Sequence, residues 1–162
     1  MHTNQFTTFH GIYFIHAQSG SQLISKQTPS ITFDVDLITG MFNALESFIN
    51  HLAYSSQFET LQDINFQGLS LIYERYGRSP NAVLCVGVCD REKDSQKAHQ
   101  LLKELLTEFY MTFSPEIRNF KGDVRPFQHF LPYIDLFTER LQFTSDSKFS
   151  SKTAIPFDLT WK

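Results

Sequence analysis

Short apolar segments separated by turn residues open the chain and predict a hairpin. A mostly apolar strand runs from Phe9 to His16, a turn follows at Ser19-Gly20, and a second strand passes through Leu23 and Ile24. Both alternating faces of the first strand are apolar, as they are in strands covered on both sides. We therefore expect this strand near the centre of a sheet.

The segment "DVDLITGMFNALESFINHLAYSS" predicts the first helix. Asp34 or Asp36 can cap its start, because either carboxylate can accept hydrogen bonds from the first backbone amides and meet the helix dipole. Apolar side chains recur at helical spacing and predict a stripe that lies on the sheet: Leu37, Met41, Ala44, Leu45, Phe48, Ile49 and Leu52. The other side of this helix carries almost no charge.

Three further strands follow. Ile64 and Phe66 belong to one strand, Leu69, Leu71 and Tyr73 alternate on the next, and Gln67-Gly68 is the expected turn between them. The run "NAVLCVGVC" is apolar on both faces and predicts a fifth strand, again central. Helices are therefore expected on both faces of the sheet.

Two helices are predicted after the fifth strand. The first begins at Asp94 or Ser95 and ends by Pro115, with one apolar face: Ala98, Leu101, Leu102, Leu105, Leu106, Phe109 and Phe113. The second spans about Asp123 to Leu141, and Pro132 either kinks it or delays its start.

We expect one domain over residues 5–143 and an extended tail over 144–162. The tail ends in a strict alternation of apolar residues, namely Ile155, Phe157, Leu159 and Trp161. This alternation suits an added edge strand. Two interpretations remain open: the tail folds back onto its own domain, or it pairs with a partner.

Composition fits a single folded domain in the cytosol. The chain has 162 residues, is 41% hydrophobic and has a formal charge of -3, which gives no general attraction for nucleic acid. The start resembles no signal peptide, and no apolar run is long enough to span a bilayer. We therefore expect a cytoplasmic protein that reaches membranes only through partners, without direct insertion.

The search for chemistry predicts no enzyme, no cofactor and no metal site. The seven glycines lack phosphate-binding spacing, and the six histidines include no helical ligand pair, so each is expected as a lone surface or rim histidine.

Cys85 and Cys89 lie about 13 Å apart along a strand, beyond disulfide reach, which predicts two small buried hydrophobes. The "DREKD" run is expected to be a solvated loop and helix cap, and "SDSK" lacks the buried surroundings that activate a serine. "YERYGRSP" could stack on bases, but two arginines on an acidic domain give little charge for it.

The order of elements resembles the longin domain, in particular the small longin-like modules of trafficking complexes and their archaeal relatives. The resemblance covers about Thr7 to Leu141 and is carried by "GIYFIHAQSGSQLIS", by "DLITGMFNALESF" with its Gly40 and Ala44, by "AVLCVGVCD" and by "AHQLLKELLTEFYMTF". It implies an α+β fold with a five-stranded, mostly antiparallel sheet, one helix on one face and two on the other, in the order β-β-α-β-β-β-α-α. The related roadblock fold places a helix before the first hairpin, and only about eight residues precede it here.

The resemblance further implies a non-enzymatic interaction module that pairs with itself or with another longin- or roadblock-like chain, as an adaptor or platform for small GTPases in vesicle trafficking. No heptad segment follows Leu141, which departs from longin-containing SNARE proteins. Charge depletion is typical of interface cores, so we expect contacts at Phe42, Asn43, Glu46 and Asn50. The alternative is a small-molecule sensory domain, for which Tyr13 and Tyr73 are the evident polar candidates.

Overall fold

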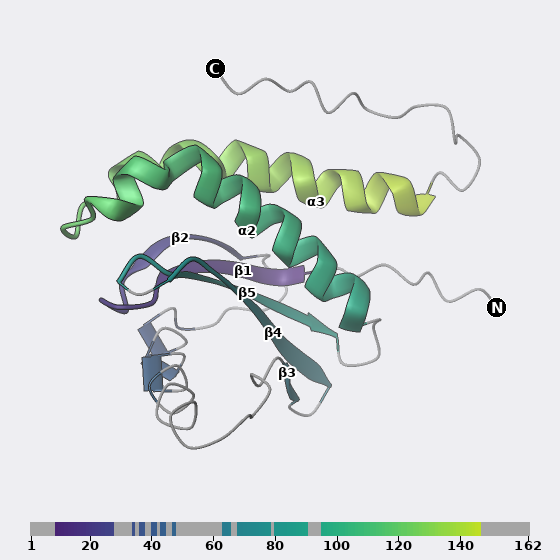
Figure 1. Ribbon diagram of the computed structural model, residues 1–162. Helices are drawn as coiled ribbons and strands as arrows, with labels where there is room; N and C mark the ends of the chain where they lie inside the picture. Colours follow the sequence, from purple (N-terminus) through teal and green to yellow (C-terminus); the bar gives the residue numbers. More distant parts are fainter. Residues whose placement is uncertain are drawn as a thin grey trace.

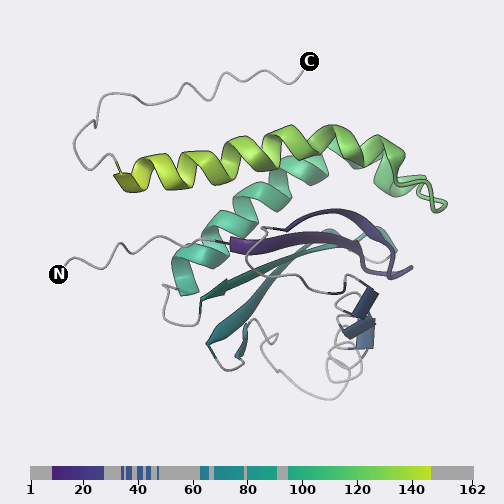
Figure 2. The same ribbon diagram turned by 180° about the vertical axis from the view of Figure 1, so that it is seen from behind.

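The protein forms an α+β fold in which helices pack on a five-stranded antiparallel sheet, as a computed structural model shows (Figure 1). Helices α2 and α3 cover one face of the sheet. Helical residues between positions 36 and 47 lie on the other side (Figure 2). The structure describes residues 9–27, 34, 36–37, 40–41, 43–44, 47, 63–65, 68–78, 80–90 and 95–146, and side chains only as far as residue 138.

The predicted hairpin is confirmed. Strand β1 spans Phe9–His16 and pairs with β2, Gln22–Gln27. Gly20 adopts a φ of 72°, a left-handed conformation that glycine reaches without steric cost. Its amide donates to the carbonyl oxygen of His16 at 2.8 Å, which closes the turn.

The remaining strands complete one sheet. Strand β3 spans Asp63–Asn65, β4 spans Leu69–Tyr76 and β5 spans Val83–Asp90. The strand order is β2-β1-β5-β4-β3, and every neighbouring pair is antiparallel. Strands β1 and β5 are therefore interior neighbours, which agrees with the apolar pattern on both of their faces.

Helix α2, Ser95–Arg118, begins where predicted and extends past Pro115. The chain leaves helical geometry at Phe113, with a φ of -115° and a ψ of 21°, and becomes helical again beyond it. Proline cannot donate an amide hydrogen bond in a helix interior, but it is tolerated in a first turn. The break at Phe113 therefore lets a second helical segment begin around Pro115, so the prediction that the helix ends there is wrong by one turn.

Pro132 delays the start of the last helix instead of kinking it. A 3-10 helix, η1, spans Arg125–Phe130, and α3 follows over Leu131–Asp146. Pro132 is the second residue of α3, where the missing amide hydrogen costs little. The helix continues to Asp146, five residues past the predicted end at Leu141.

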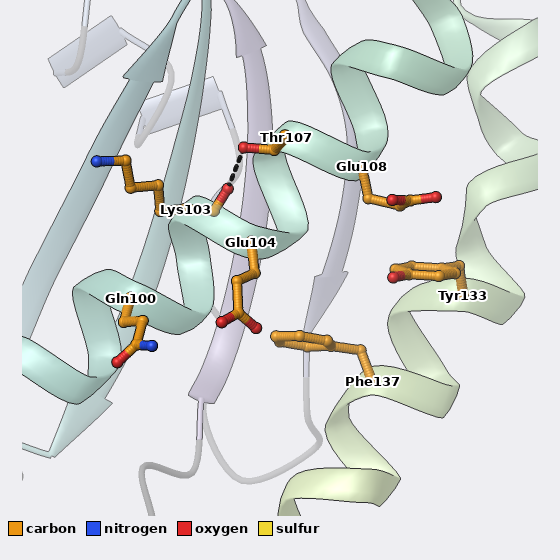
Figure 3. Close-up of a pocket in the computed structure, with 7 residues that line it drawn as sticks. All are labelled: Gln100, Lys103, Glu104, Thr107, Glu108, Tyr133 and Phe137. Carbon is orange, nitrogen blue, oxygen red and sulfur yellow. Dashed lines mark hydrogen bonds between the residues drawn. The ribbon is translucent and has the colours of Figure 1, made fainter. Parts of the chain in front are cut away.

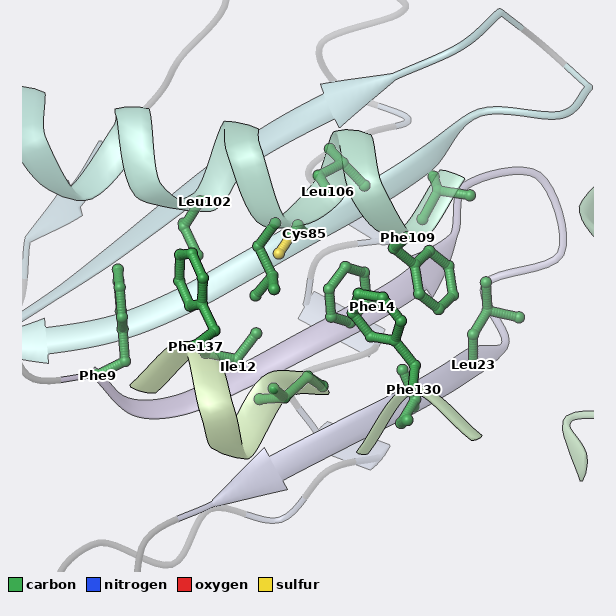
Figure 4. Packing of buried hydrophobic residues seen from close by; sticks show 14 of the residues in the cluster. Phe9, Ile12, Phe14, Leu23, Cys85, Leu102, Leu106, Phe109, Phe130 and Phe137 are labelled. Carbon is green, nitrogen blue, oxygen red and sulfur yellow. The ribbon is translucent and has the colours of Figure 1, made fainter. Parts of the chain in front are cut away.

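Two hydrophobic clusters lie on opposite faces of the sheet. The larger one joins the sheet to α2, η1 and α3 and is rich in phenylalanine (Figure 4). Phe14 stacks on Phe109 with ring centroids 4.3 Å apart, and Phe130 meets the Phe109 ring edge-on at 5.1 Å. The smaller cluster contains Tyr13, Ile15, Leu71, Tyr73, Leu84, Val86 and Val88. The predicted cover on both faces is thus supported by two separate cores.

The element order agrees with the prediction for the five strands and the last two helices. The first helix is described at seven positions only, so the complete β-β-α-β-β-β-α-α order stays a prediction. Within the part of the chain that the structure describes, no helix combines the length and apolar character needed to cross a bilayer.

Candidate functional site

The first helix presents an uncharged face to solvent. Its start is capped by Asp34, whose carboxylate accepts hydrogen bonds from the amides of Asp36 at 2.9 Å and Leu37 at 3.4 Å. Leu37 has 73% of its surface exposed, and Gly40, Ala44 and Ser47 are exposed as well. These four positions follow helical spacing and therefore lie on one face.

This orientation differs from the predicted stripe. Leu37 and Ala44 were expected on the sheet, but both are exposed, whereas Met41 packs against the smaller cluster. Apolar residues occur on more than one side of this helix, so their periodicity did not define a single buried face. The docking of Met41 on the sheet decides which side remains open.

The structure describes one of the four predicted contact residues. Asn43 is half-buried, and its side-chain amide donates to the Gly20 carbonyl oxygen in the β1–β2 turn, at 3.5 Å. Phe42, Glu46 and Asn50 lie outside the described residues. Their role in an interface stays a prediction.

The two tyrosines considered as ligand contacts share the sheet face below this helix. Tyr13 of β1 and Tyr73 of β4 both align with Val86 of β5, and both side chains are buried in the smaller cluster. The Tyr13 hydroxyl has no hydrogen-bond partner among the described residues. Burial raises the pKa of Tyr13 to about 12, so the hydroxyl stays neutral.

Three histidines have specific partners. His10 of β1 lies 2.8 Å from Asp90, and His99 of α2 lies 2.9 Å from Glu74. His16 is buried: its Nδ1 accepts from the Ser19 amide at 3.3 Å, and burial lowers its pKa. The expectation of lone surface or rim histidines is therefore wrong for these three, because their partners come from β5, from β4 and from the β1–β2 turn. Only the exposed His129 among the described histidines fits it.

The two cysteines and Tyr76 serve the fold. Residues 91–94 of "DREKD" and residues 147–148 of "SDSK" lie outside the described residues. Cys85 and Cys89 are buried and form no disulfide with each other, as predicted. Burial, with a smaller effect of Glu74, raises the pKa of Cys85 well above its usual value, which disfavours a nucleophilic thiolate. The Tyr76 ring packs on Tyr110 with centroids 4.6 Å apart, so it is engaged within the domain. No group of three or more His, Cys, Asp or Glu side chains suited to a metal occurs among the described residues.

A groove of about 490 Å³ lies between α2 and α3, on the side of the sheet opposite the first helix (Figure 3). Helix α2 lines the groove with polar and charged side chains, namely Gln100, Lys103, Glu104, Thr107 and Glu108. Helix α3 contributes two aromatic rings, Tyr133 and Phe137. The apolar face predicted for α2 implied a polar face on its other side. The sequence pattern did not predict that α3 lies beside that polar face. The groove forms because the two helices meet through the larger cluster.

Comparison with known proteins does not assign the chain to a family. No protein-family model matches the sequence, and no curated protein matches it. Among solved structures, the chain matches the crystal structure of MglC from Myxococcus xanthus with 13% sequence identity and a TM-score of 0.33. That match covers 72% of this chain and 89% of MglC.

Proposed function

We propose that this chain is a non-enzymatic protein–protein interaction module of longin type. It pairs with itself or with another longin- or roadblock-like chain, through the first helix, and acts as an adaptor or platform for small GTPases in membrane trafficking. The observation that carries the proposal is the exposed, uncharged helix face formed by Leu37, Gly40, Ala44 and Ser47. We call these four residues the helix face.

The composition of the helix face supports an interface. A leucine that is 73% exposed leaves apolar surface in water, and burying a whole leucine side chain gains about 1.5 to 3 kcal/mol. Gly40, Ala44 and Ser47 have small side chains and no charge, so a partner can approach closely at these three positions without desolvating an ion there. The predicted contacts Phe42, Asn43, Glu46 and Asn50 belong to the same segment, and we propose that the interface extends to them.

The order of elements supports the class of module. Five antiparallel strands in the order β2-β1-β5-β4-β3, with two helices across one face, agree with the layout that the longin resemblance implies. The pairing and GTPase roles rest on that resemblance and on the helix face.

Ala44→Arg tests the interface. A charged, long side chain on the helix face should raise the dissociation constant for pairing by about 100-fold or more, as expected for a disrupted interface centre. The melting temperature should change little because Ala44 is exposed. Light scattering coupled to size-exclusion chromatography over a range of concentrations measures the pairing.

Met111→Arg is the matched control. Met111 is 65% exposed on α2, on the other side of the sheet, so the same charge added there should leave pairing intact. Equal loss of pairing in both variants would contradict the assignment to the helix face. A wild-type protein that stays monomeric throughout would contradict self-pairing. A small GTPase or longin-like chain that binds immobilised wild-type protein but not Ala44→Arg would support the heteromeric form.

A further inference from the structure

The groove between α2 and α3 has two chemically different walls. On α2, Glu104 and Glu108 are four residues apart, so they lie on the same face of the helix. On α3, Tyr133 and Phe137 have the same spacing, and their rings point towards the two carboxylates (Figure 3). The groove thus offers an acidic wall opposite an aromatic wall.

The acidic wall is not neutralised within the described structure. Neither Glu104 nor Glu108 forms an ion pair with any residue that the structure describes. With Lys103 at the rim, the lining has two carboxylates and one ammonium group, and therefore a net negative charge. A cation next to a carboxylate and an aromatic face gains from both, which favours a basic occupant with apolar neighbours.

We propose that residues 147–162, the C-terminal tail, occupy this groove of their own chain. The tail has three lysines and one aspartate, so its charge complements that of the groove. It also follows directly after α3, the helix that supplies the aromatic wall. The proposal does not depend on pairing, because the groove and the helix face lie on opposite sides of the sheet.

The alternation of the tail fits the two walls. In an extended segment, odd and even positions point in opposite directions. Ile155 then faces the aromatic wall on α3, while Lys152 faces the acidic wall on α2.

Chain length indicates which lysine reaches the acidic wall. From Asp146 back to the level of Phe137 is about 14 Å, at a rise of 1.5 Å per helical residue. Six extended residues, from Asp146 to Lys152, span up to about 20 Å, enough for this return with a turn. Lys148 is only two residues beyond Asp146 and covers about 7 Å, which is too short. Lys162 lies ten residues further, about 33 Å beyond Lys152 in an extended segment. Lys152 is therefore the lysine that pairs with Glu104.

A tryptophan at position 155 allows a direct test in the full chain, because Ile155 faces the aromatic wall. Trp161 is the only tryptophan of the chain, so Ile155→Trp combined with Trp161→Phe moves the fluorescence to that position, and we call this protein the reporter. If the tail docks, emission of the reporter should be shifted to the blue of that of a synthetic peptide of residues 147–162 with the same two substitutions, and acrylamide should quench it less. Emission and quenching equal to those of the peptide would overturn the proposal.

A charge swap identifies the pair. Glu104→Lys and Lys152→Glu should each lower the ratio of docked to undocked tail about fivefold or more, because reversal replaces attraction by repulsion. The double variant, made like the single ones in the reporter, should recover the emission of the reporter. Failure of the double variant to recover it would overturn the assigned pair.

Two controls separate this effect from general charge effects. Lys148→Glu changes the tail charge equally but should leave the emission of the reporter unchanged, and Asp36→Lys should do the same from the other side of the sheet. A loss in either control as large as that in Lys152→Glu would contradict the assignment. Blue-shifted emission that disappears on dilution together with a halving of the molecular mass would show that the tail occupies a second copy, which would overturn docking within one chain.

Discussion

The hydroxyl groups of Tyr13 and Tyr110 differ in whether they have a hydrogen-bond partner. The Tyr13 hydroxyl is buried without a hydrogen-bond partner among the described residues, whereas the Tyr110 hydroxyl donates to the Asn81 carbonyl oxygen at 3.2 Å. A buried hydroxyl without a partner keeps its desolvation cost, and a paired one largely recovers it. Removing the two hydroxyls should therefore affect stability in opposite ways.

Tyr13→Phe should leave the free energy of unfolding unchanged or raise it by up to about 1 kcal/mol, because no hydrogen bond is lost. Tyr110→Phe, the matched variant, should lower it by about 0.5 to 1.5 kcal/mol. Urea unfolding of both variants measures the difference. A clear drop in stability for Tyr13→Phe would mean that its hydroxyl has a partner, which would favour the ligand-binding alternative.

At the scale of elements, the β1–β2 turn positions the first helix. Gly20 has a φ of 72°, and a Cβ atom added there would lie against the Asn43 amide group. Gly68, in the β3–β4 turn, has a φ of 77°, and a Cβ there would meet no described atom within 4 Å. The two glycines share the backbone requirement, but only Gly20 is also in close contact with the helix.

Gly68→Ala should lower the free energy of unfolding by about 1 to 2 kcal/mol, the cost of a left-handed backbone for alanine. Gly20→Ala should lower it further, because Asn43 must also move. Chemical denaturation of the two variants isolates this second contribution. Equal losses would show that the contact with Asn43 contributes nothing to the docking of the helix.

The bounds of α2 and α3 were predictable from the sequence to different degrees. The start of α2 at Ser95 and a disturbance of the last helix at Pro132 follow from local rules, but those rules left open whether Pro132 kinks the helix or delays its start. The extension of α2 past Pro115 does not, since it depends on a backbone break at Phe113, whose side chain packs in the larger cluster. Tertiary packing there outweighs the local preference to stop.

At the scale of the whole molecule, the sheet has a central pair and two edges. Strands β1 and β5 each have long hydrogen-bonded neighbours on both sides and separate the two clusters. Strands β2 and β3 are at the edges, with one neighbouring strand each among the described residues. Opening of the edges exposes less apolar surface than opening of the centre.

Amide hydrogen exchange should follow this arrangement. Amides of β1 and β5 should exchange most slowly, and those of β2 and β3 fastest among the strands, because central strands open only with the whole domain. Mass spectrometry of exchanged peptides measures the order. Protection of β2 equal to that of β5 would contradict the edge position of β2 or indicate that another segment covers it.

The sequence by itself predicted the five strands, the β1–β2 turn, the presence of the two long helices and the burial of both cysteines, because hydrophobic periodicity and turn chemistry are properties of neighbouring residues. Only the tertiary structure decided which side of the first helix faces solvent. It also decided that His10 meets Asp90, 80 residues away, and that Glu104 and Glu108 face two rings of α3. These features depend on segments that are far apart in the chain, and packing of the two cores brings them together.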